Sequence, residues 1–359
     1  MRVPTLILDV ERAEANLDRI LARARNWGVR FRPHFKTHQS ADVAALFRER
    51  GVAACTVSSV RMAEYFADHG WDDITIAVPL NLRELDGLRR LATRVRLGVL
   101  VDSLAGAAPL MSGDLPDVAV WIKVDCGYGR TGVWWESADA LGELAGVIDA
   151  AGGIELAGVL THAGLSYAEA SPDAVRMIHR QSLSRVRRAR EAIAAVRRSG
   201  ARLDVSVGDT PTASLAESME GVDEIRPGNF IFYDLMQFDI GSCRDRNLAV
   251  AVACPIIGVY SQRGEIVVYC GAVHLSMAAR ADGTFGCLVE PGEHGLDELR
   301  PDAPVVRLSQ EHGIIRGPAD IMERSAVGDI VLISPVHSCL TAALYDHYLT
   351  LDGRRLGRM

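Results

Sequence analysis

The feature that most constrains the fold of this chain is an alternation of short β-like runs with longer helical segments, between about residues 5 and 240. Such an alternation is typical of parallel strands joined by helical crossovers. Residues 182–199, for example, favour helix by composition and space their apolar side chains along one face. When the first β-like run, 5–9, is excluded, eight such runs remain. The pattern therefore predicts an α/β fold with a TIM-type (β/α)8 barrel. The predicted strands are 5–9, 30–33, 54–57, 74–77, 96–101, 118–124, 156–160, 204–207 and 224–226.

Beyond residue 241 the pattern changes to strands punctuated by Gly and Pro, with little helix between them. A chain of 359 residues also exceeds the size at which one hydrophobic core usually stops growing, so two domains are expected. We predict a barrel over 14–240, a mostly-β domain over 241–359, and an N-terminal strand within 1–13 that joins the β domain. The later predicted strands are 248–261, 265–270, 305–308 and 329–334.

Charge and composition exclude several classes of partner. The net charge is −7 and the basic residues are scattered, so the chain offers no basic face for a nucleic acid. The first residues lack the apolar region of a signal peptide, and no run of about 18 apolar residues could span a membrane. Seven dispersed cysteines do not form the framework of a disulfide-rich domain. A cytoplasmic globular protein is expected.

A lysine stands between two histidines directly after the first barrel strand, in Pro33-His34-Phe35-Lys36-Thr37-His38. Chemistry in such barrels gathers at the carboxyl ends of the strands. A lysine placed there can become a nucleophile or a Schiff-base partner, because burial and nearby cations lower the pKa of its amine. An ordinary surface lysine is the alternative that these residues leave open.

Two turns after late barrel strands combine glycine with hydroxyl or amide side chains. They are Gly208-Asp209-Thr210 and Arg226-Pro227-Gly228-Asn229. A tight turn explains either one alone. Together they occupy the place where this architecture often binds a phosphate group with backbone amides.

Near the C-terminus, His337 and Cys339 lie two residues apart, so on an extended segment both side chains point to one face. Such a pair can bind one metal ion, and a thiolate with an imidazole favours zinc over magnesium. Two buried structural residues are the alternative. His312 could lie nearby or be a solvated loop histidine.

In their order along nearly the whole chain, these motifs resemble the fold type III pyridoxal-phosphate enzymes with an alanine-racemase-like N-terminal barrel, in the branch of D-serine dehydratase and D-threonine aldolase. The residues that carry the resemblance are Pro4 to Asp9 with Asn16, Pro33 to His38, Val124 to Gly132, Thr161 to Gly164, Arg226 to Asn229 with Tyr233-Asp234, Gly271 to His274, Gln310 to Gly313, and Pro335 to Cys339.

The resemblance implies that Lys36 holds pyridoxal 5′-phosphate as a Schiff base. The other matched positions surround the cofactor in the family. The resemblance places Arg130 near the phenolic oxygen, His162 against the ring, Tyr167 near the Schiff base, and Thr210, Gly228 and Asn229 around the phosphate. Arg226 matches the position that faces the pyridine nitrogen in alanine racemases, whereas the dehydratase and aldolase branch varies there.

The resemblance also implies that His337 and Cys339 bind a divalent metal, with Zn²⁺ expected and Mn²⁺ or Mg²⁺ as alternatives. Aldolases of the family carry Asp as the second ligand, whereas D-serine dehydratases carry His-x-Cys as this chain does. We therefore expect a lyase that converts a D-β-hydroxy amino acid to a 2-oxo acid and ammonia. Retro-aldol cleavage to glycine and an aldehyde is the alternative, and a non-catalytic pyridoxal-phosphate-binding protein is a third. A homodimer is also implied.

Overall fold

A computed structural model describes residues 1–115, 117–197, 201–292 and 295–359 of the chain. These residues form two compact units. The barrel unit comprises 20–36 and 47–228, and the β unit comprises 1–19, 37–46 and 229–359. Composition suggested one boundary near residue 240, whereas the β unit begins at Asn229 and also includes 37–46. The short segment belongs there because the Tyr348 hydroxyl donates to the His38 carbonyl (2.6 Å) and the Gly357 amide donates to Asp42 (2.9 Å).

The barrel unit is built from parallel strands and the helices between them. Its strands are β2 (Arg30–Phe31), β3 (Ala54–Val57), β4 (Asp73–Pro79), β5 (Arg96–Val101), β6 (Val118–Asp125), β7 (Val133–Trp134), β8 (Glu155–Thr161), β9 (Asp204–Val207) and β10 (Glu224–Ile225). Its helices are α3 (Val60–Asp68), α4 (Leu85–Ala92), α5 (Leu104–Met111), α6 (Ala138–Ala150), α7 (Pro172–Val196) and α8 (Thr210–Leu215), with parts of α1 (Val10–Trp27) and α2 (Ala41–Glu49).

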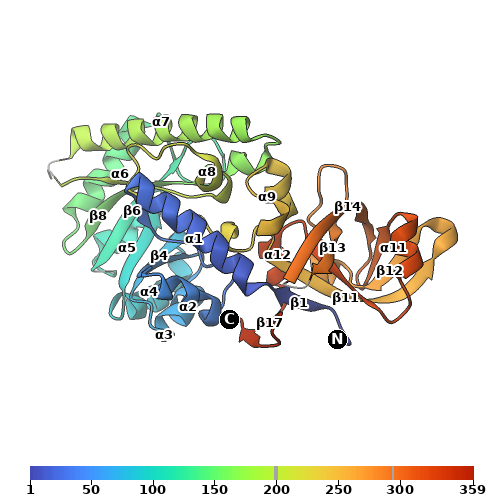
Figure 1. Ribbon diagram of the computed structural model, residues 1–359. Helices are drawn as coiled ribbons and strands as arrows, with labels where there is room; N and C mark the ends of the chain where they lie inside the picture. Colours follow the sequence, from blue (N-terminus) through green and yellow to red (C-terminus); the bar gives the residue numbers. More distant parts are fainter. Residues whose placement is uncertain (116, 198–200, 293–294) are drawn as a thin grey trace. The chain divides into compact units, whose positions relative to one another are not determined.

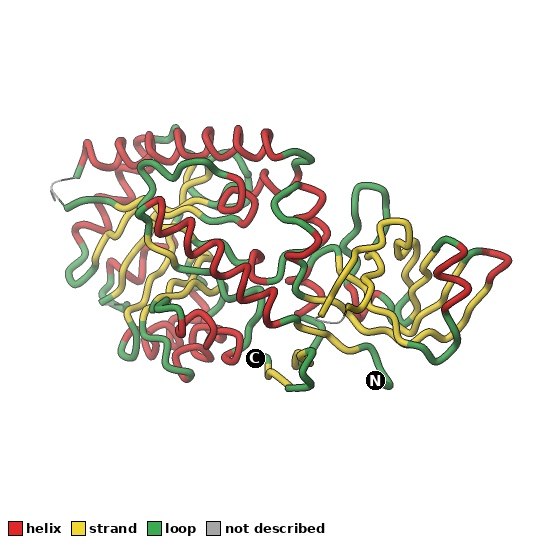
Figure 2. Tube along the Cα trace, in the orientation of Figure 1, coloured by secondary structure: helices red, strands yellow, loops and turns green. Residues whose placement is uncertain are grey.

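The predicted (β/α)8 barrel is confirmed. In the described part of the chain, eight parallel strands pair in the order β2–β10–β9–β8–β6–β5–β4–β3. The ring closes after β2, because the Phe35 amide donates to the Thr56 carbonyl and the Thr56 amide donates to the Pro33 carbonyl, each over 2.8 Å. Figures 1 and 2 show the helices of this unit outside its strands.

Helix α7 illustrates how local sequence sets an element. It begins ten residues before the predicted helix 182–199, because Ser171 caps it and Pro172 occupies its first turn. Its buried stripe includes Val175, Val186 and Ile193, and these side chains turn toward the barrel. Residues 198–200 of the predicted helix lie outside the described residues.

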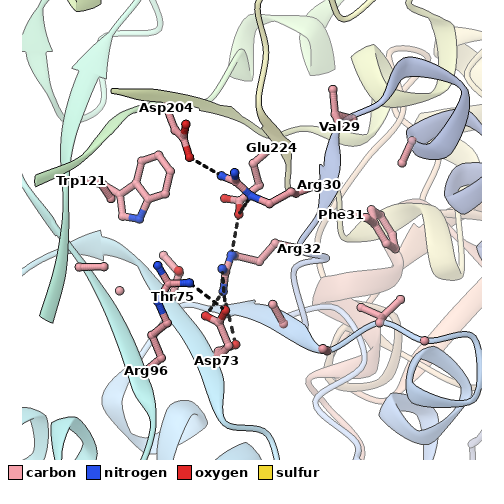
Figure 3. A pocket seen from close by; sticks show the side chains of 18 of the residues that line it. Val29, Arg30, Phe31, Arg32, Asp73, Thr75, Arg96, Trp121, Asp204 and Glu224 are labelled. Carbon is pink, nitrogen blue, oxygen red and sulfur yellow. Dashed lines mark hydrogen bonds and ion pairs between the residues drawn. The ribbon is translucent and has the colours of Figure 1, made fainter. Parts of the chain in front are cut away.

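Charged side chains surround a cavity of about 450 Å³ at the amino ends of the barrel strands (Figure 3). Arg32 pairs with Asp73 at the start of β4 (2.6 Å) and with Glu224 at the start of β10 (2.8 Å). Arg30 pairs with Asp204 at the start of β9 (2.7 Å). Because these charges are paired with one another, and this end of a barrel generally carries stability rather than chemistry, the cluster holds the strand starts together.

The β unit consists of a largely antiparallel sheet with short helices. Its strands are β1 (Thr5–Leu8), β11 (Val250–Tyr260), β12 (Glu265–Tyr269), β13 (Gly286–Gly292), β14 (Gly295–Leu308), β15 (His312–Arg316), β16 (Ile330–Pro335), β17 (His347–Thr350) and β18 (Arg355–Gly357). Its helices are α9 (Leu235–Ile240), α10 (Ala272–Leu275), α11 (Ala319–Arg324) and α12 (Ser338–Ala342).

Six strands of this unit close into a ring, in the order β11–β12–β15–β14–β13–β16 and back to β11. Strand β1 extends the sheet beside β11, and β17 and β18 follow it. The mostly-β character predicted for this part of the chain is confirmed. Among the residues the structure describes, no helix is both long enough and apolar enough to cross a bilayer.

Candidate active site

Lys36 lies at the carboxyl end of β2, and the residues before it fix its position. The His34 amide donates to the Pro227 carbonyl (2.9 Å), which ties this segment to the turn after β10. The Phe35 ring is fully buried and packs against two other rings. Its centroid lies 5.1 Å from that of Phe47 and 4.9 Å from that of Phe66. Phe35 to His38 form a turn after the strand, and the buried Phe35 ring anchors that turn directly before Lys36. The Lys36 side chain is exposed there.

The loop after β6 carries Arg130 and is shaped by one carboxylate. Asp125 Oδ1 accepts hydrogen bonds from the backbone amides of Gly127 (2.9 Å), Tyr128 (2.9 Å) and Gly129 (3.1 Å). The Tyr128 ring lies under the Arg130 guanidinium, 5.1 Å from its carbon to the ring centroid. The loop therefore presents Arg130 from the carboxyl end of β6 on an aromatic support.

His162 follows β8 and is held as a neutral imidazole. Its Nδ1 lies 2.5 Å from the Gly208 carbonyl, and its ring contacts Tyr128 edge to face with centroids 5.8 Å apart. Burial, followed by the charge of Lys36, lowers the pKa of His162 well below its ordinary value. Because Nδ1 donates to a carbonyl, Nε2 carries the lone pair of the ring.

The turn after β9 is held in place by local hydrogen bonds. The Thr210 amide donates to the Tyr167 hydroxyl (3.2 Å), so two predicted cofactor residues meet there. Asp209 begins α8 and accepts from the Thr212 amide (2.7 Å), which fixes the turn. Gly208 packs so closely on Arg226 that an added Cβ would lie 3.0 Å from that side chain. The backbone here therefore approaches the end of β10 without intervening side chains.

Arg226 is buried at the end of β10 and belongs to a continuous chain of hydrogen bonds. Its Nε donates to Ser206 Oγ and its Nη2 donates to the Thr161 carbonyl, each over 2.7 Å. Ser206 Oγ in turn donates to Glu224 Oε1 (2.7 Å), and the other Glu224 oxygen accepts from Arg32. Burial lowers the pKa of Arg226 to about 10, and the charge of Glu224 opposes that shift. The network thus links the charged cluster of Figure 3 to the carboxyl end of the barrel.

In the β unit, His337 and Cys339 belong to one cluster of polar groups. His337 Nδ1 lies 3.1 Å from Asp234 Oδ2. Asn229 Nδ2 donates to the same oxygen (2.7 Å) and lies 3.6 Å from Cys339 Sγ. Thr37 Oγ1 is 3.2 Å from Cys339 Sγ. The expectation of an extended segment is wrong, because Cys339 lies in α12, which begins directly after His337. Both side chains still belong to one cluster around Asp234 and Asn229.

The predicted site residues fall into two groups. The barrel unit carries Lys36, Arg130, His162, Tyr167, Thr210, Arg226 and Gly228 on the carboxyl ends of its strands, and the β unit carries Asn229, His337 and Cys339. The Asn229 side-chain nitrogen donates to Asp234 and lies near Cys339, so the amide group of Asn229 faces this cluster. His312 begins β15 opposite Tyr269.

Two features of the site were not predicted. Lys123 is buried in β6, and burial together with Arg226 lowers the pKa of its amine to about 8. Asp234 appeared only as part of a matched motif. An apolar flank around a lysine, as in Trp121-Ile122-Lys123-Val124, is a sequence signal for the first. The second depends on residues about 100 positions apart, for which the sequence holds no local signal.

Comparison with known proteins covers the whole chain. Residues 8–235 match the family model described as the alanine racemase N-terminal domain, and residues 249–351 match a putative serine dehydratase domain. The D-threo-3-hydroxyaspartate dehydratase of Delftia sp. (strain HT23) is 34% identical over 98% of this chain and 94% of its own length. The D-serine dehydratase of Dictyostelium discoideum is 27% identical over 92% of this chain and 88% of its own length.

A solved structure has the same architecture throughout. It is a cysteine-to-alanine mutant of D-threo-3-hydroxyaspartate dehydratase in the metal-free form, with a TM-score of 0.91 and 31% identity over 100% of this chain and 98% of the other. The resemblance inferred from the motifs is confirmed. The chain therefore belongs to the alanine racemase N-terminal-domain family, in the group of fold type III pyridoxal-phosphate enzymes that carry a serine dehydratase domain.

Proposed function

We propose that this chain is a lyase dependent on pyridoxal phosphate and a divalent metal, which dehydrates a D-β-hydroxy amino acid to a 2-oxo acid and ammonia. The observation that carries the proposal is the combination, on one chain, of Lys36 at the carboxyl end of the barrel with a clustered His337 and Cys339. The 34% identity to D-threo-3-hydroxyaspartate dehydratase over nearly the full length of both chains supports this reaction class.

The barrel residues fit pyridoxal phosphate. Lys36 supplies the amine that would hold the aldehyde, and the turns at Gly208–Thr210 and Gly228–Asn229 offer amides and a hydroxyl for the phosphate. The tight approach of Gly208 to Arg226 forms part of this cradle. When bound, pyridoxal phosphate supplies an electron sink for charge at Cα, and a divalent ion supplies a Lewis acid for the β-hydroxyl.

The β-unit residues fit a zinc ion with open positions. Imidazole and thiolate are the donors that zinc prefers over magnesium. His337 and Cys339 would supply two donors, and the remaining positions on the ion would be open to water and substrate. Asn229 Oδ1 is buried without a hydrogen-bond partner in the described ranges, and the amide nitrogen of the same side chain lies 3.6 Å from Cys339 Sγ, which fits a polar ligand at this place.

Three barrel residues then have definite tasks. The Lys36 amine would hold the cofactor and, once free, would serve as the base for the Cα proton. His162 contributes an uncharged ring against the cofactor, because its Nδ1 is committed to the Gly208 carbonyl. Arg226 matches the position that faces the pyridine nitrogen in alanine racemases, and it would present a cation there, because Glu224 balances its charge through Ser206.

Product analysis tests the proposal. The purified, zinc-supplemented holoenzyme is incubated with D-serine, D-threonine and D-threo-3-hydroxyaspartate, and keto acid, ammonia, glycine and aldehyde are assayed together. We expect keto acid and ammonia, with both lost in Lys36→Ala. Glycine with an aldehyde would show retro-aldol cleavage instead, and absence of turnover with all three substrates would favour the non-catalytic alternative.

We also propose that the chain forms a homodimer, as the family resemblance implies. Size-exclusion chromatography of the holoenzyme, with the molar mass measured by light scattering, tests this. A dimer has twice the mass of the 38.9 kDa chain. A mass equal to one chain would contradict it.

A further inference from the structure

The Tyr233-Asp234 motif has no task in the reaction as described, yet Asp234 lies at the centre of the His337 and Cys339 cluster. We propose that Asp234 is a positioning residue that orients His337 toward a divalent metal ion and fixes the charge of the site. The inference rests on the proposed function, because it assumes that His337 and Cys339 bind a metal.

The two oxygens of Asp234 have separate partners. Oδ1 accepts from the Gln237 amide (3.0 Å) and so caps α9. Oδ2 faces His337 Nδ1 (3.1 Å) and also accepts from the Ser338 amide (2.8 Å) and from Asn229 Nδ2 (2.7 Å). The carboxylate is 1% exposed, so water does not compete for these bonds.

This arrangement selects one form of the histidine. A carboxylate cannot donate, so the hydrogen on His337 must reside on Nδ1, the nitrogen that faces Oδ2. The lone pair then resides on Nε2, which is the form of the ring that binds metals. A carboxylate behind a metal-binding histidine fixes its orientation and raises its basicity, and removal of such a partner typically weakens metal binding 10- to 100-fold.

The same carboxylate organises the second donor through Asn229. The Asn229 amide is anchored on Asp234 Oδ2 and on Ser338 Oγ (3.0 Å), and from there it lies 3.6 Å from Cys339 Sγ. Loss of the Asp234 charge would therefore disturb both members of the pair.

The backbone before Asp234 supports a specialised role. Tyr233 has a φ of +50°, a conformation that a bulky residue rarely adopts. Its ring is fully buried, with the Arg19 guanidinium 5.0 Å from the ring centroid. A strained backbone conformation persists only where many surrounding contacts hold it in place, and such residues tend to occur at functional sites. Here the strain turns the chain so that Asp234 both begins α9 and reaches His337.

The test compares Asp234→Asn with Asp239→Asn in the full-length holoenzyme. Asp239 lies on the same helix but pairs with Arg280 (2.7 Å) on a part-exposed surface, so it is the matched control. Asparagine caps a helix as well as aspartate, so α9 should be retained. We measure the Zn²⁺ dissociation constant by competition with a chromophoric chelator, and the absorbance of bound pyridoxal phosphate in the same samples.

We expect Asp234→Asn to weaken Zn²⁺ binding 10- to 100-fold while the cofactor absorbance stays unchanged, and Asp239→Asn to match the wild type. Nitrogen NMR of the histidine-labelled protein should also show His337 moving from the Nδ1-protonated form toward a mixture. Should Asp234→Asn fail to fold, Asp234→Ser keeps the helix cap and removes the charge, and the same loss is expected.

Two results would overturn the inference, and only one of them would also contradict the proposed function. Equal Zn²⁺ affinity in the wild type and in Asp234→Asn would show that Asp234 only caps α9, and the proposed function would stand. Absence of Zn²⁺ binding by the wild-type holoenzyme would remove the metal from the proposed function and this inference with it.

Discussion

At the scale of single residues, Cys339 differs from the other cysteines of the chain. Six of the seven are buried, and Cys339 is the part-exposed one. Burial raises the pKa of several of the six, including Cys126 to about 11 and Cys287 to about 12, which suppresses their reactive thiolate form. We therefore expect one thiol to react rapidly with a disulfide reagent in the folded, metal-free protein, and Zn²⁺ to protect it.

Cys339→Ser should abolish the rapid phase, and Cys55→Ser should leave it unchanged because Cys55 is fully buried. A rapid phase that survives Cys339→Ser, or that Zn²⁺ does not slow, would contradict this assignment. The readout is the absorbance of the released thiolate, which requires no turnover.

Ser206 offers a second prediction at this scale, because it connects Arg226 to Glu224. Ser206→Ala leaves the buried Nε of Arg226 without its partner, and an unsatisfied buried donor costs about 1–3 kcal/mol of stability. The free energy of unfolding in urea should fall by that amount. Ser184→Ala, at an exposed position on α7, is the control and should change it little. Equal midpoints for the two variants would refute the linking role of Ser206.

The site residues differ in how far the sequence could predict them. Lys36 stands directly after a predicted strand, so barrel geometry alone places it at the mouth. His337 and Cys339 are two apart and likewise give a local signal. Asp234 acts on His337 across 103 positions, and no pattern near either residue indicates that they meet. The side-chain role of Asn229 depends on the same tertiary contact.

At the scale of elements, the loop after β6 requires glycine in a way that a helix does not. Gly132 has a φ of +116°, and an added Cβ would lie 2.6 Å from the Asp125 amide nitrogen. Gly132→Ala should therefore displace the loop that carries Arg130 and weaken the binding of pyridoxal phosphate. A loss of about 1.4 kcal/mol in binding free energy corresponds to an affinity about tenfold lower. Cofactor titration followed by absorbance is the measurement.

The matched substitution is Gly146→Ala in α6, where an added Cβ meets nothing within 4 Å. An exposed helical glycine replaced by alanine should stabilise the protein by about 0.5–1 kcal/mol and leave cofactor affinity unchanged. If both variants bound the cofactor like the wild type, the loop would not depend on Gly132.

Periodicity predicted the barrel strands better than those of the β unit. Each of the eight predicted barrel strands overlaps an observed one, because buried parallel strands appear as short apolar runs. In the β unit, β13, β15, β17 and β18 were missed, and only the last part of β14 was predicted. Pro301 and Pro304 interrupt the pattern of β14, and the sheet accommodates them with register irregularities opposite β13. Pairing of this kind depends on the partner strand, which the local sequence does not reveal.

At the scale of the whole molecule, buried histidines set the response to acid. Burial lowers the pKa of His38 to about 3 and also lowers those of His162 and His179. Histidines of the unfolded chain titrate near 6.5, so below that pH the unfolded chain binds more protons than the folded one. Stability is thus fully present above pH 6.5 and falls below it, by about 1.4 kcal/mol per pH unit for each histidine that stays neutral.

Asp209 acts in the opposite sense, because burial raises the pKa of its carboxyl to about 6 and the folded state therefore gains a proton first. The three histidines outnumber it, so urea unfolding should show a net loss of stability between pH 6.5 and pH 5. His179→Gln should make that loss smaller than in the wild type. A loss of the same size in the variant and in the wild type would contradict the assignment.

The place of β1 in its sheet also has a consequence for how the protein is made. Thr5 to Leu8 pair with β11 and with β17, so the strand that leaves the ribosome early has partners more than 240 residues later. At a synthesis rate of about 5–20 residues per second, β1 waits on the order of 12–50 s for β11 to emerge. During that interval its apolar side chains lack their native cover, whereas the barrel strands from β3 to β10 each pair with a strand that is near in the sequence. A tag or mutation at the N-terminus should therefore affect the yield of folded β unit before it affects the barrel.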